Sequence, residues 1–226
     1  MADSVPISNK INLNLAIRLD DGITPTGDNG VDAATDGKIF YDTTRNKYVI
    51  QACRWLIDSL VKLLGIEVAT PLLQGTLTSQ SITFSATGTA VNKDFLYPSR
   101  LLQSTTIQFY YITSRADAVI DVAPYQDYVY TIDNGKLYGW IRTSGTLTLQ
   151  SSGTATFYYI GSPRVDTSTG ADVAVNTAPD IALDTRFHDA ITAYAQYLGC
   201  SDKSTSYWLN KAKLAFDEAV SYLPKA

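Results

Sequence analysis

The chain has few of the residues that most often catalyse reactions or bind metals. It contains one histidine and two cysteines in 226 residues, and Glu67 and Glu218 are its only glutamates. It has no Cys-x-x-Cys pair, no Gly-x-Ser-x-Gly motif and no phosphate-binding glycine loop. We therefore expect a protein that is not an enzyme and that uses neither a cofactor nor a metal ion.

The single histidine is His188, and Asp189 follows it directly. Neighbouring residues on a helix point about 100° apart, so this carboxylate cannot orient the imidazole ring. We therefore favour a packing or capping histidine over a catalytic one. Cys53 and Cys200 lie in separate helical patterns and make a poor zinc set with His188. We expect free, buried thiols in a reducing cytoplasm.

The chain also lacks clustered basic residues and long apolar runs. Its 22 acidic residues outnumber its 18 basic ones, giving a net charge of −4. This balance argues against nucleic acid as the main partner. No apolar run approaches the length of a membrane span, and residues 1–20 lack the features of a signal peptide. We expect neither a membrane partner nor export.

The most prominent pattern present is a long helix over residues 42–65. A narrow polar stripe runs along it, and apolar residues occupy more than one face, so we expect the helix to be packed on several sides. Asp42 or Thr43 can cap its start, and Gly65 suits the left-handed position after its end. The main apolar stripe and its flanks comprise Val49, Ala52, Cys53, Leu56, Leu60, Leu63 and Leu64.

Two stretches precede this helix. Residues 1–20 alternate like a strand but also repeat every four residues like a helix, and we favour the helix. Residues 20–37 form an acidic loop by their glycines and lack of periodicity. The spacing of Asp28, Asn29 and Asp32 does not match a calcium-binding EF-hand, so a solvated loop is the favoured interpretation.

After Ala69-Thr70-Pro71 breaks the helical pattern, short β-branched and aromatic runs continue to about Gly161. Asn134-Gly135 between two runs predicts a type I′ hairpin, because both residues can adopt positive φ. Ser144-Gly145 and residues 151–153 predict two further tight turns, and hence an antiparallel meander. The predicted strands are residues 81–85, 105–113, 125–133, 136–143, 146–150 and 154–160.

Alternation within these strands predicts bulky residues on both faces of the sheet. Tyr128, Tyr130 and Ile132 share one face, whereas Tyr138 and Trp140 share a face of the next strand. With 15 tyrosines in the chain and few basic residues among them, a protein–protein interface is favoured over a sheet core or a ligand platform. The predicted inter-subunit surface is Tyr128, Tyr130, Tyr138 and Trp140.

Two helices are predicted at the end of the chain. Asp184 caps the first, in which Phe187, Ile191, Tyr194 and Leu198 recur at helical spacing before Gly199. The second carries the apolar residues Trp208, Ala212, Ala215, Phe216, Ala219 and Leu223, and ends at Pro224.

The resulting prediction is an α+β fold: a helical bundle, with an inserted antiparallel β meander or sandwich. The bundle comprises the long central helix over residues 43–64 and the C-terminal helical hairpin packed back on it. We expect an N-terminal helical part over residues 1–70, a β-rich insertion over 71–165, and a connector with the hairpin over 166–226.

The order of these elements resembles that of tailed-bacteriophage head-to-tail adaptors of the podophage type, also called head-completion or connector proteins. The likeness includes the strand end Phe157-Tyr158-Tyr159-Ile160-Gly161-Ser162-Pro163 and the helix start Phe187-His188-Asp189-Ala190-Ile191. It covers most of the chain and rests on packing motifs. The acidic loop over residues 20–37 departs from it.

The resemblance implies a structural virion protein at the neck, made in the cytoplasm of the bacterial host. Such proteins form rings, usually of twelve copies, between the portal protein and the tail or other neck proteins. It implies no nucleic-acid binding beyond lining the channel of the ring. The alternative is a carbohydrate-binding or other β-rich ligand-binding module, which would use the tyrosines of the sheet.

The end of the chain is a candidate portal-docking segment. It cannot continue as a helix past Pro224, it carries an aromatic and an aliphatic residue, and weak contacts of this kind add up over many copies. The segment is Tyr222, Leu223, Pro224, Lys225 and Ala226.

Overall fold

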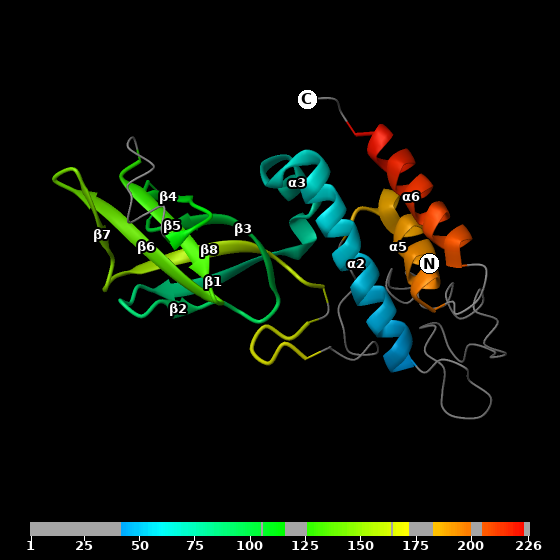
Figure 1. The fold of residues 1–226 in the computed structure, drawn as a ribbon, viewed down its shortest axis with the longest axis horizontal. Helices are drawn as coiled ribbons and strands as arrows, with labels where there is room; N and C mark the ends of the chain where they lie inside the picture. The colour runs from blue at the N-terminus through cyan, green and yellow to red at the C-terminus, as the bar shows by residue number, and fades with distance from the viewer. Residues whose placement is uncertain are drawn as a thin grey trace, which may run out of the picture. The chain divides into compact units, whose positions relative to one another are not determined.

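The computed structural model of the protein describes residues 42–104, 106–115, 126–163, 165–171, 183–199 and 205–223. The predictions for residues 1–20 and for the loop over 20–37 lie outside this range. The fold is mixed α+β, with helices, then an eight-stranded and mostly antiparallel open sheet, then a helical pair (Figure 1). The chain divides into two compact units. A sheet unit spans Leu77–Gly161 and Thr167–Gly170, and a helical unit contains the described α-helices and Ser162–Asp166.

Helix α2, Asp42–Leu64, confirms the predicted long helix. Its side chains from residue 47 onward show why it forms, since Val49, Cys53, Leu56 and Leu60 of the predicted stripe are all buried. Ile50, Ala52 and Ile57 are buried as well, so more than one face is packed, as predicted. Leu63, which flanks the stripe, is an exception, because its side chain is 56% exposed.

A short helix follows where the sequence predicted a break. Gly65 has a φ of 78°, as predicted, but its ψ of 159° starts a new helix, α3, over Ile66–Leu72. Pro71 lies inside this helix. Because proline has no N–H, the hydrogen bond that residue 71 would donate to the carbonyl oxygen of Glu67 is absent. Thr70 supports the turn by donating from its hydroxyl to the carbonyl oxygen of Ile66 at 2.7 Å.

The C-terminal pair consists of α5, His188–Gly199, and α6, Thr205–Ser221. A turn of 3₁₀ helix, η2 over Thr185–Phe187, leads into α5, and the predicted cap Asp184 accepts a hydrogen bond from the backbone N–H of Arg186 at 3.0 Å. Helix α5 packs against both α2 and α6. The Trp55 ring stacks on the ring of Tyr194 with centroids 4.3 Å apart. Aromatic packing thus joins the helices of this unit.

The sheet has the strand order β1-β8-β3-β4-β5-β6-β2, with β7 also paired to β6. Every neighbouring pair is antiparallel except β4 and β5, which are parallel. A short helix, η1 over Gln74–Thr76, precedes the first strand. The strands are β1 Leu77–Thr83, β2 Thr89–Ala90, β3 Phe95–Leu102, β4 Gln108–Tyr111, β5 Tyr128–Asp133, β6 Lys136–Thr143, β7 Thr146–Leu149 and β8 Thr154–Gly161.

Two of the three predicted turns are hairpins. Asn134 and Gly135 have φ values of 50° and 70°, as type I′ requires, and they join β5 to β6. Ser144 and Gly145, at 53° and 85°, join β6 to β7 in the same way. The meander ends there, because β8 does not pair with β7 but crosses to lie between β1 and β3. The prediction that the turn over 151–153 makes a third hairpin is therefore wrong.

The sheet carries apolar clusters on both faces, as alternation predicted. One cluster contains Val129, Tyr138 and Trp140. The larger cluster draws on six strands, and Phe84 after β1 reaches β6, where a Cβ on Gly139 would lie 2.5 Å from its ring. The sheet therefore curls around this cluster, whose buried members are Ile82, Phe84, Val91, Leu101, Phe109, Tyr130, Leu137, Ala155, Phe157 and Tyr159.

Candidate functional site: the exposed face of helix α6

The candidate catalytic residues of the sequence do not come together in the structure. Nε2 of His188 lies 3.3 Å from the carbonyl oxygen of Leu183, so the ring packs at the start of α5. Asp184 accepts two hydrogen bonds from the guanidinium of Arg186, at 3.0 and 2.6 Å. These bonds hold the pKa of the Asp184 carboxyl below its usual range. The arrangement caps a helix start, and Asp189 is exposed.

Cys53 is fully buried in the helical unit and is not part of a disulfide. Cys200 and the acidic loop over residues 20–37 lie outside the described residues. In the described part of the chain, no group of three or more His, Cys, Asp and Glu side chains is arranged to hold a metal ion. The same residues include no helix long and apolar enough to cross a membrane.

The predicted tyrosine surface of the sheet does not form a single exposed face. Tyr128 and Tyr130 contribute to the larger cluster, whereas Tyr138 and Trp140 belong to the cluster on the other face. Tyr130, Tyr138 and Trp140 are 1%, 8% and 5% exposed, and Tyr128 is half-buried. In this structure these side chains stabilise the sheet unit, and only Tyr128 remains partly accessible to a partner.

Tyr130 shows how deep this burial is. Its hydroxyl has no hydrogen-bond partner among the described residues. Burial, and in second place the neighbouring Tyr111, raises the pKa of the Tyr130 phenol. The ring of Tyr111 lies 5.4 Å from that of Tyr130, centroid to centroid. The phenol therefore remains neutral and does not supply a reactive group.

The predicted docking segment is described only at its beginning. Tyr222 is 68% exposed just after α6, and Leu223 is half-buried, with its backbone N–H donating to the carbonyl oxygen of Val220 at 2.9 Å. Pro224, Lys225 and Ala226 lie outside the described residues. Tyr222 is thus available to a partner at the end of the helix.

Helix α6 has an exposed apolar face as well as a buried one. Ala212, Phe216 and Ala219 are buried against the rest of the helical unit. On the opposite side, Tyr207 and Leu214 are 57% and 69% exposed, in line with Tyr222 beyond the helix end. The other large exposed hydrophobic residues of the described chain are Leu63, Val68, Tyr110 and Tyr111.

These exposed residues follow one line along the helix. Tyr207, Lys211, Leu214, Glu218 and Tyr222 are separated by four, three, four and four residues, so they fall within an arc of about 80°. We call this line the outer stripe of α6. The sequence did not indicate the outer stripe, because apolar and charged residues alternate along it. A continuous apolar stripe, which is the usual sign of a packed helix face, lies on the other side of α6.

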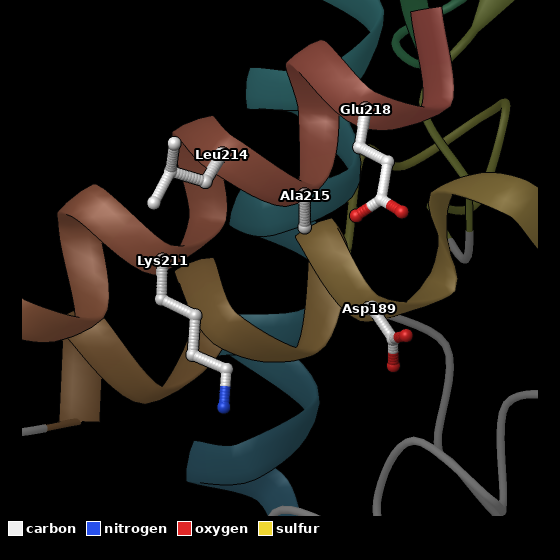
Figure 2. A pocket seen from close by; sticks show the side chains of 5 residues that line it. All are labelled: Asp189, Lys211, Leu214, Ala215 and Glu218. Atoms are coloured by element: carbon white, nitrogen blue, oxygen red, sulfur yellow. The ribbon is translucent and has the colours of Figure 1, made fainter. Parts of the chain in front are cut away.

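A shallow pocket of about 280 Å³ opens beside the outer stripe, between α5 and α6 (Figure 2). The side chains of Glu218 and Asp189 lie at one end of the pocket and that of Lys211 lies at the other (Figure 2). Leu214 and Ala215 complete its lining. The pocket therefore presents charges of opposite sign around a small apolar centre, an arrangement that suits a protein partner.

No family model matches the sequence, and neither does any curated protein.

Proposed function

We propose that the protein is a structural subunit of a tailed-phage neck, a head-to-tail adaptor that joins other copies in a ring between portal and tail. In this proposal the helices form a bundle interrupted by the β-rich insertion. The portal protein, other neck or tail proteins and further copies of the chain are its partners. The virion is its place of action, after synthesis in the bacterial host.

The observation that carries the proposal is where the resemblance motifs lie. Of the aromatic strand end, Phe157, Tyr159 and Ile160 are buried, so this motif forms part of the sheet core. It leads directly to Ser162, whose hydroxyl accepts a hydrogen bond from Nε of Arg54 on α2 at 2.7 Å. The strand end is thus also the point at which the chain re-enters the helical unit.

The second motif behaves in the same way. Phe187 and Ile191 are buried, and α5 packs against both α2 and α6. Each motif therefore contributes apolar side chains to the core of its own unit. The packing role of both motifs, together with the exposed outer stripe of α6, supports a protein that docks with other proteins.

A carbohydrate-binding module remains the second interpretation. It would need exposed aromatic rings that share a face. The exposed tyrosines of the sheet, Tyr110 and Tyr111, are consecutive on β4, so they point to opposite faces. This arrangement favours the adaptor proposal.

The test is association with portal rings. The full chain is mixed with purified portal rings encoded by the same genome and centrifuged through a density gradient. We expect it to sediment with the rings and to add a layer of density beneath them in cryo-electron microscopy. A chain that stays at the top of the gradient while the portal rings remain intact would overturn the proposal, and binding on a glycan array would favour the alternative.

A further inference from the structure

We infer that α6 binds α6 of a second copy of this chain, antiparallel, through the outer stripe. The inference comes from the order of side chains along that stripe, which reads Tyr207, Lys211, Leu214, Glu218 and Tyr222. Read in reverse, the order places a tyrosine at each end and exchanges lysine for glutamate. The stripe is therefore complementary to its own reverse, and this holds independently of the proposed function.

A two-fold axis between Leu214 and Ala215 brings the complementary groups together. Lys211 then faces Glu218 of the second copy, and Glu218 faces the second copy's Lys211. Leu214 lies against the small side chain of Ala215, and Tyr207 faces Tyr222. Every position of the stripe thus has a compatible neighbour in a contact that uses the same surface on both copies.

Other arrangements of two such helices are disfavoured by charge. In a parallel pair in register, Lys211 would face Lys211 and Glu218 would face Glu218. Like charges placed opposite each other across an interface oppose association. Lys211 and Glu218 therefore favour contact between two copies of α6, and they favour the antiparallel arrangement over the parallel one.

The pocket beside α6 provides a place for the incoming charge. The carboxylates of Glu218 and Asp189 lie at the same end of the pocket (Figure 2), and neither forms an ion pair within the described residues. In the two-fold arrangement, this end receives Lys211 of the second copy. Within its own chain, Nζ of Lys211 lies 5.1 Å from the ring centroid of Trp208, so its position is already restricted.

The expected contact is small. From Tyr207 to Tyr222 the stripe is about 22 Å long, and contacts of one helix with another lie at the low end of interface sizes. We therefore expect a dimer whose population depends on protein concentration. A two-fold contact closes on itself, so it describes the free subunit and does not extend around a ring.

The test uses charge reversal on the full chain, with sedimentation velocity at several concentrations as the measurement. Lys211→Glu and Glu218→Lys each replace two attractive contacts by two repulsive ones, so each should weaken the dimer by about tenfold or more. Mixing the two variants restores opposite charges at both contacts and should restore dimers. Lys213→Glu and Asp217→Lys are matched controls, because both residues are exposed on α6 but lie off the stripe.

Circular dichroism establishes that each variant is folded, and the mixture provides a gain of association that misfolding cannot produce. The inference stands if wild type dimerises, each variant alone does not, and the mixture does. A wild type that stays monomeric at every concentration would overturn it. So would a dimer that the single reversals leave unchanged, or folded variants that fail to associate when mixed.

Discussion

The two units of the molecule use their aromatic residues in different ways. In the sheet unit, Tyr130, Phe157 and Tyr159 are almost completely buried, and the ring of Phe157 contacts each of the other two. In the helical unit, α6 places Tyr207 and Tyr222 on its outer side, where more than half of each side chain is exposed. Both units are rich in aromatic residues, but among the described residues only α6 carries exposed rings in one line, since the exposed Tyr110 and Tyr111 of β4 point to opposite faces of the sheet.

This difference shows that burial decides the role of an aromatic residue and that composition does not. The sheet tyrosines attract attention by their number, but the sheet curls around them and needs them for its own core. An apolar side chain left exposed in a line with charged neighbours is the more informative signal. Substitutions in the sheet should therefore cost folding stability, and substitutions on the outer stripe should cost association.

The largest expected effect is that of Phe157→Ala. Phe157 is fully buried, and its ring contacts those of Phe95, Tyr130 and Tyr159. Removing the ring leaves a cavity, which should lower the free energy of unfolding by about 3–5 kcal/mol. Urea denaturation measures the loss. Leu214→Ala, on the outer stripe, should lower the free energy of unfolding by less than about 0.5 kcal/mol. Equal losses for the two variants would contradict the distinction between a buried sheet core and an exposed helix face.

A core position of the helical unit should respond almost as strongly. Leu56 on α2 is fully buried, so Leu56→Ala should lower the free energy of unfolding by about 2–5 kcal/mol. Lys62→Ala on the same helix removes an exposed side chain and should cost well under about 1 kcal/mol. Thermal melts of the two variants test the assignment of faces. Similar melting temperatures would show that it is wrong.

A substitution in the first hairpin should destabilise the sheet unit and leave the helical unit folded. Gly135→Val places a β-branched residue at a φ of 70°, which should cost about 1–3 kcal/mol. Hydrogen exchange should then show lost protection in β5 and β6 while α2 and α5 keep theirs. Ser144→Gly is the control at the neighbouring hairpin, since glycine accepts the φ of 53° found there. An unchanged hairpin in a crystal structure of Gly135→Val would contradict the argument.

Local patterns in the sequence predicted the helices and turns whose formation depends on neighbouring residues. The spacing of Val49, Cys53, Leu56 and Leu60 predicted α2, and the positive φ available to Asn134-Gly135 predicted the first hairpin. Strand β3 was not predicted, and its Pro98 lacks the N–H that a central strand uses for pairing. The structure accommodates this proline next to an irregularity in the pairing of β3 with β8.

Features decided by distant contacts could not be predicted. The position of β8 between β1 and β3 depends on the curl of the whole sheet, and no turn sequence encodes it. Likewise, the exposure of Leu63 and Leu214 depends on which neighbouring segments cover each helix face. The outer stripe of α6 is also decided by distant contacts, so it could not be predicted from local patterns. The sequence instead indicated the tyrosines of the sheet as the interaction surface.

A pair of conservative substitutions tests the polar side of the sheet core. The hydroxyl of Tyr159 donates to Oδ1 of Asp94 and accepts from Nδ2 of Asn92, both at 2.8 Å. Tyr159→Phe should therefore cost about 1–2 kcal/mol. Tyr130→Phe removes a buried hydroxyl that has no partner among the described residues, so it should be neutral or stabilise by up to about 1 kcal/mol. Urea denaturation of both variants measures the difference, and losses of equal size would refute it.

The smallest expected effect on stability is that of ending the chain after Ser221. The change removes Tyr222, which is 68% exposed, and Leu223, which is half-buried just beyond α6. The truncated chain should remain folded by circular dichroism, with its free energy of unfolding changed by less than about 0.5 kcal/mol.

If the chain end docks on the portal, the truncated chain should nevertheless fail to sediment with portal rings, because many weak contacts are lost together. Tyr222→Phe, which keeps the ring, should still bind. Truncated protein that joins the rings normally would refute docking by this segment while leaving the adaptor proposal standing. If the truncated chain is folded but does not bind portal rings, Tyr222 and its neighbours contribute to partner binding. The buried tyrosines of the sheet, in contrast, contribute to folding stability.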